Sequence, residues 1–186
     1  MSARTETILR HWREAVPDDR LAHLVKDATR ALVRALQMRL AEHQVSFGHW
    51  TFLRILWEGD GLTQRELSDE AGVMEPTTFS ALKAMERLGY IRRQRGDDRK
   101  KVYVFLTPNG RALKRVLVPL AEEVNAVAAR RVRKADVATT RAVLLAIIEN
   151  LAREEAAQDK RMPSTRVLAR IGKPLGTKRK RPHKRA

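Results

Sequence analysis

The sequence contains no cysteine among its 186 residues. This absence excludes disulfide bonds, thiolate catalysis and zinc sites that use cysteine ligands. The five histidines are scattered along the chain, so we expect neither a metal ion nor another cofactor. No run approaches the roughly 20 apolar residues of a membrane span, and the first residues, MSARTETILRHW, have no apolar signal core. We therefore expect a soluble cytoplasmic protein without a membrane partner.

The motifs of common catalytic sites are also missing. The sequence has no glycine-rich phosphate loop, no carboxylate pair on a shared predicted face and no nucleophile with a suitably spaced base. We therefore predict that the protein is not an enzyme.

Acidic residues are few compared with basic ones, and the formal net charge is +16. Such a charge points to nucleic acid or an anionic surface as the partner. Eleven of the 38 basic residues and none of the 22 acidic residues lie in residues 160–186. This end has no aromatic residue and too little apolar surface to offset the entropy of folding. We predict a disordered basic tail over 156–186 that contacts phosphates; a tail that only raises solubility is the alternative.

Two segments before residue 60 have helical periodicity. Apolar side chains in residues 21–42 recur every three to four positions, which predicts one long amphipathic helix. Pro17, Asp18 and Asp19 precede this helix as a turn and cap. Ser46 is placed to cap a second helix over 47–58. Residues 1–20 are expected to form an N-terminal arm.

A helix-turn-helix is predicted to follow. Thr63 and Glu66 have the spacing of a capping box, which opens a third helix that stops at Ala71 and Gly72. A fourth helix is expected from Glu75 to Leu88, with Pro76 in its first turn and Gly89 as its stop. The predicted apolar face of the fourth helix consists of Thr78, Ala81, Leu82, Met85 and Leu88.

Two short extended runs come next, Ile91–Arg95 and Lys101–Leu106, around a turn with Gly96, Asp97 and Asp98. A hairpin this short is barely stable alone and must pack on a larger body. Two helices, a tight turn and a ribbon are the layout of a winged helix, which we place at residues 46–107.

Long helices are expected on both sides of this domain. Thr107 and Pro108 open a fifth helix to about Arg133, and Asp136 caps a sixth. The inward residues of the sixth are predicted to be Val137, Leu144, Ile147, Ile148 and Leu151. One subunit offers these apolar stripes little to pack on, so residues 21–45 and 108–155 are predicted to pair with a second copy. The predicted fold is mainly α, with a winged helix-turn-helix core and a small β-ribbon between long dimerisation helices.

The chain resembles the MarR family of transcriptional regulators over residues 21–155. The resemblance rests on LTQREL at 62–67, on Asp98, Arg99 and Lys100, and on the VFLTPNG that follows at 104–110. It implies a homodimer that binds a pseudopalindromic operator on double-stranded DNA. It also implies, as the family default, repression that is relieved by a small phenolic or aromatic ligand.

The outward side of the fourth helix is predicted to enter the major groove, where side chains near a helix N-terminus reach base edges. The candidate DNA contacts on this helix are Pro76, Thr77, Phe79, Ser80 and Lys83. Family members often carry arginine where Ser80 stands, so direct guanine reading is not expected there. Phe79 either meets a thymine methyl or belongs to the core. The alternative for the whole face is a set of ordinary solvated positions.

Arg99 is the leading candidate of the predicted wing. An arginine on a narrow ribbon tip fits an A·T-rich minor groove, and Asp97 or Asp98 can hold its guanidinium in place. Further contacts to the DNA backbone are predicted for Gln64, Arg65, Arg95, Lys100 and Lys101. The alternative is a solvated hairpin whose charges prevent aggregation.

His49 and Trp50 are weak candidates for binding a small aromatic acid or its thioester. The simpler alternative makes Trp50 a core residue and His49 a capping or surface residue. A second function also remains open, that of a ligand-independent architectural DNA-binding protein with little sequence preference.

Overall fold

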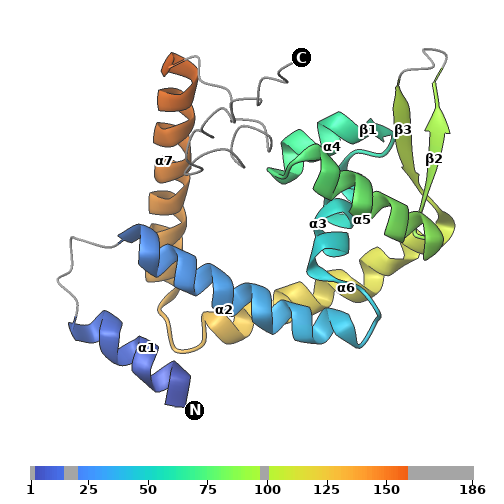
Figure 1. Ribbon diagram of the computed structural model, residues 1–186. Helices are drawn as coiled ribbons and strands as arrows, with labels where there is room; N and C mark the ends of the chain where they lie inside the picture. The colour runs from blue at the N-terminus through green and yellow to red at the C-terminus, as the bar shows by residue number, and fades with distance from the viewer. Residues whose placement is uncertain (1–2, 15–20, 97–100, 159–186) are drawn as a thin grey trace, which may run out of the picture. The chain divides into compact units, whose positions relative to one another are not determined.

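The computed structural model describes residues 3–14, 21–96 and 101–158 (Figure 1). Seven helices and three strands occupy these ranges. In chain order they are α1 (Ala3–Glu14), α2 (Leu21–Ala41), α3 (Phe47–Glu58), β1 (Leu62–Thr63), α4 (Gln64–Ala71), α5 (Glu75–Arg87), β2 (Ile91–Arg95), β3 (Val102–Leu106), α6 (Pro108–Ala128) and α7 (Lys134–Gln158). The mainly helical fold with a small sheet is confirmed. Residues 17–19 and 97–100, on which some predictions rest, lie outside the described residues.

The predicted caps of α3 and α4 are confirmed. The Ser46 hydroxyl accepts a hydrogen bond from the backbone amide of His49 at 3.1 Å and opens α3. At the start of α4, Thr63 and Glu66 form both halves of the capping box. Gly72, in the left-handed conformation with φ of 63°, ends α4.

The ribbon is part of a three-stranded antiparallel sheet in the order β1-β3-β2. Ile91 pairs with Leu106, and Arg95 pairs with Val102. Strand β1 was not predicted, because two residues are too few to show a period. It adds Leu62 beside Val104 on the inner edge and leaves β2 as the outer edge.

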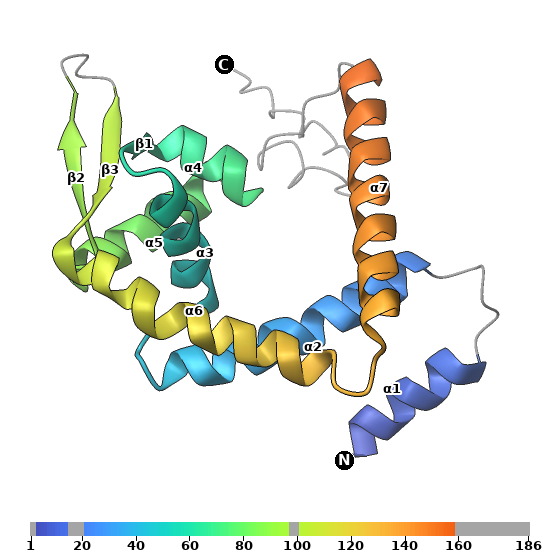
Figure 2. The ribbon, with the colours of Figure 1, turned by 180° about the vertical axis from the view of Figure 1, so that it is seen from behind.

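Helices α2 and α6 lie side by side in both views (Figures 1 and 2). Arg39 of α2 reaches Glu123 of α6 through two hydrogen bonds of 3.0 and 3.3 Å. The chain divides into two compact units, residues 1–137 and 138–186, so most of α7 belongs to the second unit. Among the described helices, none combines the length and apolar character that a membrane crossing requires.

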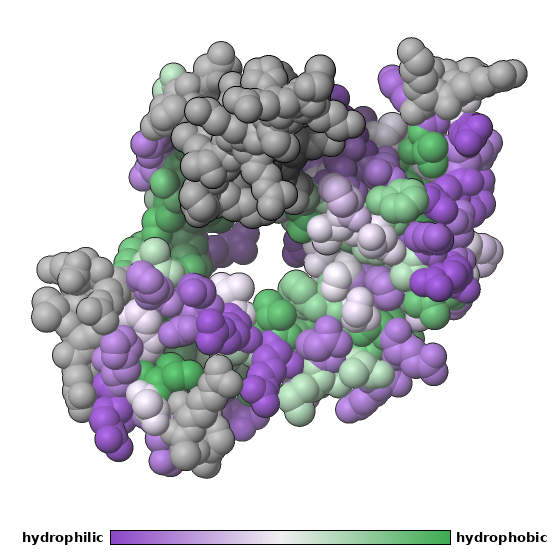
Figure 3. Space-filling model, viewed as in Figure 1, coloured by the Kyte–Doolittle hydropathy of each residue, from purple (hydrophilic) through white to green (hydrophobic). Residues whose placement is uncertain are grey.

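Helix α7 carries an exposed apolar stripe, and hydrophobic residues are visible along it in Figure 3. The residues predicted to face inward are open in the single chain: Val137, Leu144, Ile148 and Leu151 are 38–63% exposed, and Ile147 is half-buried. They are therefore not part of the core of one subunit.

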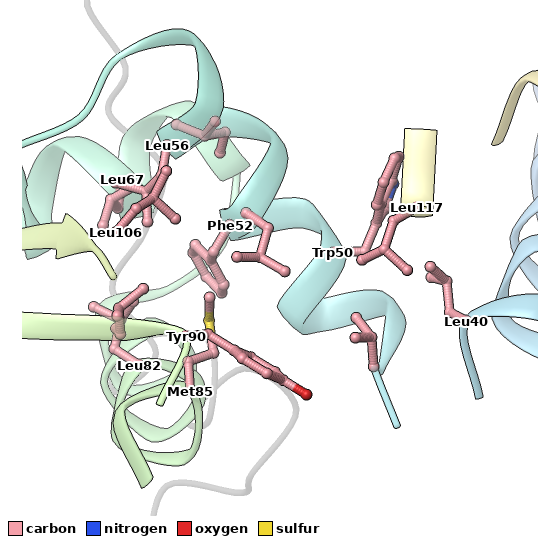
Figure 4. Close-up of a cluster of buried hydrophobic side chains, with 14 of the residues drawn as sticks. Leu40, Trp50, Phe52, Leu56, Leu67, Leu82, Met85, Tyr90, Leu106 and Leu117 are labelled. Atoms are coloured by element: carbon pink, nitrogen blue, oxygen red, sulfur yellow. The ribbon is translucent and has the colours of Figure 1, made fainter. Parts of the chain in front are cut away.

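Helix α3 carries the centre of the core, which extends toward both sides of the helix (Figure 4). Phe52 and Leu56 lie with buried residues of the winged helix, including Leu67 and Leu82. Trp50, near the N-terminal end of α3, lies with residues of α2 and α6, which include Leu40 and Leu117. The winged helix is thereby packed onto the α2–α6 pair through one continuous helix.

Several predicted boundaries were wrong. Helix α6 ends at Ala128 rather than near Arg133, and Arg131 adopts a positive φ of 63°. Four basic residues between 130 and 134 disfavour continued helix, because like charges one turn apart repel. Asp136 lies inside the first turn of α7 and pairs with Arg133 at 2.7 Å instead of capping the helix.

Three smaller findings concern single segments. Leu88 is 42% exposed, because it lies at the end of α5, where the helix leaves the core. The N-terminal arm contains a helix, α1, whose Trp12 indole donates to Asp27 of α2 at 3.0 Å. Residues 156–158 continue α7 rather than belonging to a tail, and the rest of the predicted tail lies outside the described residues.

Candidate nucleic-acid interface

Helix α5 has one buried side and one open side. Thr78, Leu82 and Met85 are fully buried on the inner side. The exposed residues of the other side include all five predicted contacts on this helix, namely Pro76, Thr77, Phe79, Ser80 and Lys83. The structure therefore brings these predicted residues to one open surface.

A hydroxyl pair fixes α5 against α4. Ser68 Oγ lies 2.8 Å from Thr78 Oγ1 and 2.9 Å from the carbonyl oxygen of Gln64, and both side chains are buried. Buried hydroxyls that satisfy each other are worth more in a low-dielectric interior than in water. The pair joins the buried sides of the two helices, opposite the open side of α5.

Phe79 is 48% exposed, which excludes the alternative that it is a core residue. The guanidinium carbon of Arg93, on β2, lies 5.8 Å from the centre of its ring. Arg93 also binds Glu86 of α5 through its side chain, at 2.6 and 2.9 Å, and through its backbone amide, at 3.1 Å. The hydrogen bonds from Arg93 hold the pKa of Glu86 below its ordinary value.

The sequence did not single out Arg93. Its spacing of seven residues from Glu86 carries no signal, because the two residues lie on different elements. The hairpin register, with Arg93 opposite Val104, brings the arginine back over α5.

The ribbon presents basic side chains on both faces. Arg92 lies over the ring of Phe105 at 4.6 Å and donates to Gln94 at 2.7 Å. Predicted contacts Arg95 and Lys101 are exposed at the far end of the ribbon. Figure 3 shows mainly hydrophilic residues along this side of the molecule.

The two strands remain joined beyond their last ladder pair. Gly96 donates to the carbonyl oxygen of Lys101 at 3.1 Å. The four residues that connect them, Asp97, Asp98, Arg99 and Lys100, lie outside the described residues, so their roles stay predictions.

Gln64, Arg65 and Lys101 line one cleft of about 540 Å³ at the start of α4. Three carboxylates share this cleft: Glu66, Asp69 and Glu75. The backbone amide and hydroxyl of Thr63 hold the pKa of Glu66 below its ordinary value, and Lys101 adds to the effect. The cleft is thus of mixed charge. Within it, Arg65 forms an ion pair with Asp69, with 4.0 Å between Nε and Oδ2.

The two weak effector candidates differ in setting. Trp50 is 7% exposed and packs edge-on against Trp57, with ring centres 5.6 Å apart, so it is a core residue. His49 is half-buried beside Tyr90, and within the described residues its Nδ1 is buried without a hydrogen-bond partner. Burial lowers the pKa of His49.

No group of three potential metal-ligating side chains occurs in the part of the chain that the structure describes. The surface formed by α5, the start of α4 and the ribbon offers polar groups, the exposed ring of Phe79 and positive charge. Such a set suits hydrogen bonding and charge neutralisation on a polyanion rather than covalent chemistry.

Comparison with known proteins gives a consistent picture. The MarR family model matches residues 45–102. The chain is 35% identical over 98 residues to the HTH-type transcriptional regulator TtmR of Methylorubrum extorquens (strain PA1), which is 52% of this chain and 50% of TtmR. The chain thus spans half the length of this curated relative.

Solved structures extend the similarity to the flanking helices. A MarR family transcriptional regulator from Listeria monocytogenes, solved in complex with a 26mer DNA, has a TM-score of 0.67 and 22% identity, over 78% of this chain and 99% of that one. BpsR of Bordetella bronchiseptica, whose DNA binding is regulated by 6-hydroxynicotinic acid, has a TM-score of 0.63 and 19% identity, over 72% and 98%. The motifs, the winged helix and the family match agree: residues 45–102 of this chain match the MarR family, and the solved structures share the fold of the flanking helices.

Proposed function

We propose that this chain is a cytoplasmic, homodimeric transcriptional regulator that binds a pseudopalindromic operator and acts as a repressor. The observation that carries the proposal is the open side of α5 beside a basic ribbon. A helix of this size fits the major groove, and a ribbon next to it can reach the adjacent backbone or minor groove. The family and the DNA complex of the Listeria relative support the same conclusion.

The residues divide into three roles. Thr77, Ser80 and Lys83 have hydrogen-bonding groups that reach base edges or phosphates from α5. Arg95 and Lys101, with Arg99 and Lys100 at the tip, supply the positive charge of the wing, and Asp97 and Asp98 orient Arg99. Pro76, Gln64 and Arg65 contact the backbone at the helix starts.

The dimer is supported by exposed apolar surface in each unit. In the first unit, a groove lined almost wholly by apolar residues of α2 and α6, with Arg39 at one side, has a volume of about 380 Å³. In the second unit, α7 exposes the stripe described above. Surfaces of this kind are rarely left open in soluble monomers. We propose that a second copy covers them, with residues 21–45 and 108–155 as the dimerisation region.

The alternative, an architectural protein with little sequence preference, predicts different binding behaviour. A regulator should bind a site upstream of its own gene about a thousandfold or more tighter than random duplex at physiological salt. Gel-shift titrations with both duplexes at several salt concentrations measure this ratio. A ratio near one at every salt concentration contradicts the regulator and favours the architectural protein.

We also propose that a small aromatic acid weakens DNA binding. The support is the regulation of BpsR by 6-hydroxynicotinic acid and the unpaired Nδ1 of His49 at the side of the core. Calorimetry with 6-hydroxynicotinate and salicylate, followed by gel shifts with each, tests the proposal. The absence of both binding and displacement for a panel of such acids would count against it.

A further inference from the structure

Arg93 is the most constrained of the described ribbon arginines. Successive side chains of a strand point to opposite faces, so Arg93 points toward α5 while Arg92 points toward Phe105. Its guanidinium and backbone amide both bind the Glu86 carboxylate. A guanidinium that is neutralised and anchored in this way is not free to meet a phosphate.

The same guanidinium lies against the ring of Phe79. Phe79 and Glu86 are two helical turns apart and therefore share one face of α5. The Arg93 guanidinium lies within 2.6 Å of the Glu86 carboxylate and 5.8 Å from the centre of the Phe79 ring, so it contacts both residues. Contact of a guanidinium with an aromatic face is favourable and fixes the orientation of the ring.

Phe79 is a large apolar side chain on a polar surface. Its contact with water is unfavourable in free energy. Without a partner, the ring would exchange between rotamers. We infer that Arg93, held by Glu86, is a positioning residue that presents the exposed edge of Phe79 to a thymine methyl group. This inference rests on the proposed DNA-binding function and adds a specificity determinant to it.

Thymine follows from the chemistry of the major groove. The other base-edge groups there are hydrogen-bond donors and acceptors, which an aromatic ring cannot satisfy, and the C5 methyl of thymine is the apolar group of the set. A ring fixed in place gains this contact without losing rotamer entropy on binding. The Arg93–Glu86 pair therefore governs preference at one base pair and adds little to overall charge attraction.

The experiment first defines the operator by selection of the full-length protein on a randomised duplex pool. Each selected thymine is then replaced by deoxyuridine, which removes the methyl group and nothing else. For the wild-type protein, we expect one thymine position in the half-site at which deoxyuridine weakens binding. Replacement of that thymine in a single half-site should weaken binding about fourfold, the equivalent of one lost methyl contact. For Phe79→Ala, that replacement should have no effect.

Three further variants separate positioning from charge. Arg93→Lys keeps the charge but loses the planar fork, and Glu86→Gln keeps the shape but loses the anchor. Both should lose the thymine preference at this position and keep preference at the others. Arg92→Lys is the matched control, because it changes the neighbouring arginine, which packs on Phe105. It should keep the fourfold effect.

The outcomes are distinct. If the wild-type protein enriches no sequence, the proposed function fails and the inference fails with it. If it enriches an operator but Phe79→Ala keeps the methyl effect, the inference alone is wrong. If Arg93→Lys and Glu86→Gln, verified as folded by thermal melting, keep the wild-type discrimination, Arg93 has no positioning role.

Discussion

Gly110 is the residue at which the start of α6 meets the ribbon most closely. A methyl group at this position would collide with the carbonyl oxygen of Tyr90 and come within 3.1 Å of a Leu106 methyl. The Gly110 carbonyl also accepts a hydrogen bond from the Trp57 indole at 2.9 Å. Gly110→Ala should therefore lower the free energy of unfolding by about 1–3 kcal/mol, the usual range for overpacking, as measured by urea denaturation.

Gly48 provides the control for this prediction. It also lies in the first turn of a helix, α3, but a methyl group there would meet only Ser46 Oγ at 3.8 Å. Gly48→Ala should raise stability by up to about 1 kcal/mol, because alanine loses less backbone entropy than glycine. Equal effects at the two glycines would show that the close approach at Gly110 is unimportant.

His49 predicts an acid-sensitive stability. Burial lowers its pKa in the folded state from the ordinary value of 6.5. Below that value the unfolded chain takes up the proton first, so stability falls as pH falls from 6.5 toward the folded pKa. His49→Phe keeps a ring beside Tyr90 but cannot titrate. Between pH 7.5 and 5.5, the melting temperature of this variant should therefore fall less than that of the wild-type protein. The other histidines are common to both proteins and cancel in the comparison; parallel curves would contradict the prediction.

Arg99 allows a test of the wing by charge alone. Four residues, 97–100, connect Gly96 to Lys101, and Arg99 is the one predicted to enter the minor groove. Arg99→Ala should weaken operator binding and reduce the salt slope by about one unit, with little loss of thermal stability. Gel shifts at varied salt measure both. Arg54→Ala, an exposed arginine of α3, is the control, and an unchanged affinity of Arg99→Ala would refute the role of the wing.

At the scale of elements, the Ser68–Thr78 pair joins the two helices of the helix-turn-helix. Thr78→Val removes one hydroxyl and leaves Ser68 bonded to Gln64, so it should cost about 1 kcal/mol. Ser68→Ala leaves the Thr78 hydroxyl buried without its partner and should cost about 1–3 kcal/mol. The double variant should be less unstable than the sum of the two, because neither orphan remains. Denaturation of all four proteins measures the coupling, and strict additivity would mean that the hydroxyls do not interact.

Elements that carry their own local signals were predictable from the sequence. Ser46, Thr63 with Glu66, and Gly72 act on the backbone within four residues, so the bounds of α3 and α4 were predicted to within a residue or two. The end of α6 has no glycine, and the apolar stripe gave no reason to stop before Arg133. Strand β1 exists because β3 lies beside it, and two residues cannot show that in a sequence.

The candidate site was predictable only in part for the same reason. The exposed face of α5 follows from helical period, and its five predicted contacts are all open. Contacts between residues that are far apart in the chain leave no periodic pattern in the sequence, so they could not be predicted. Asp60 shows this: it binds Arg111 at 2.7 Å and the Leu106 amide at 2.8 Å, across some 50 residues. Arg93 was missed in the same way, since its contacts with Phe79 and Glu86 depend on the register of the hairpin.

At the scale of the whole molecule, the prediction that matters most is the dimer. Leu144, Ile148 and Leu151 lie at intervals of four and three residues, which places them on one stripe of α7. A charge at the centre of this stripe would have to be buried without a partner in a paired assembly. We predict that the wild-type protein has twice the 21.2 kDa mass of one chain and that Ile148→Glu is a monomer, as measured by light scattering at micromolar concentration. Asn150→Glu, on another side of the same helix, should stay dimeric.

The monomer should also lose operator binding, because one subunit reads only half of a palindrome. A monomer that still protected a symmetric site would contradict the predicted dimer.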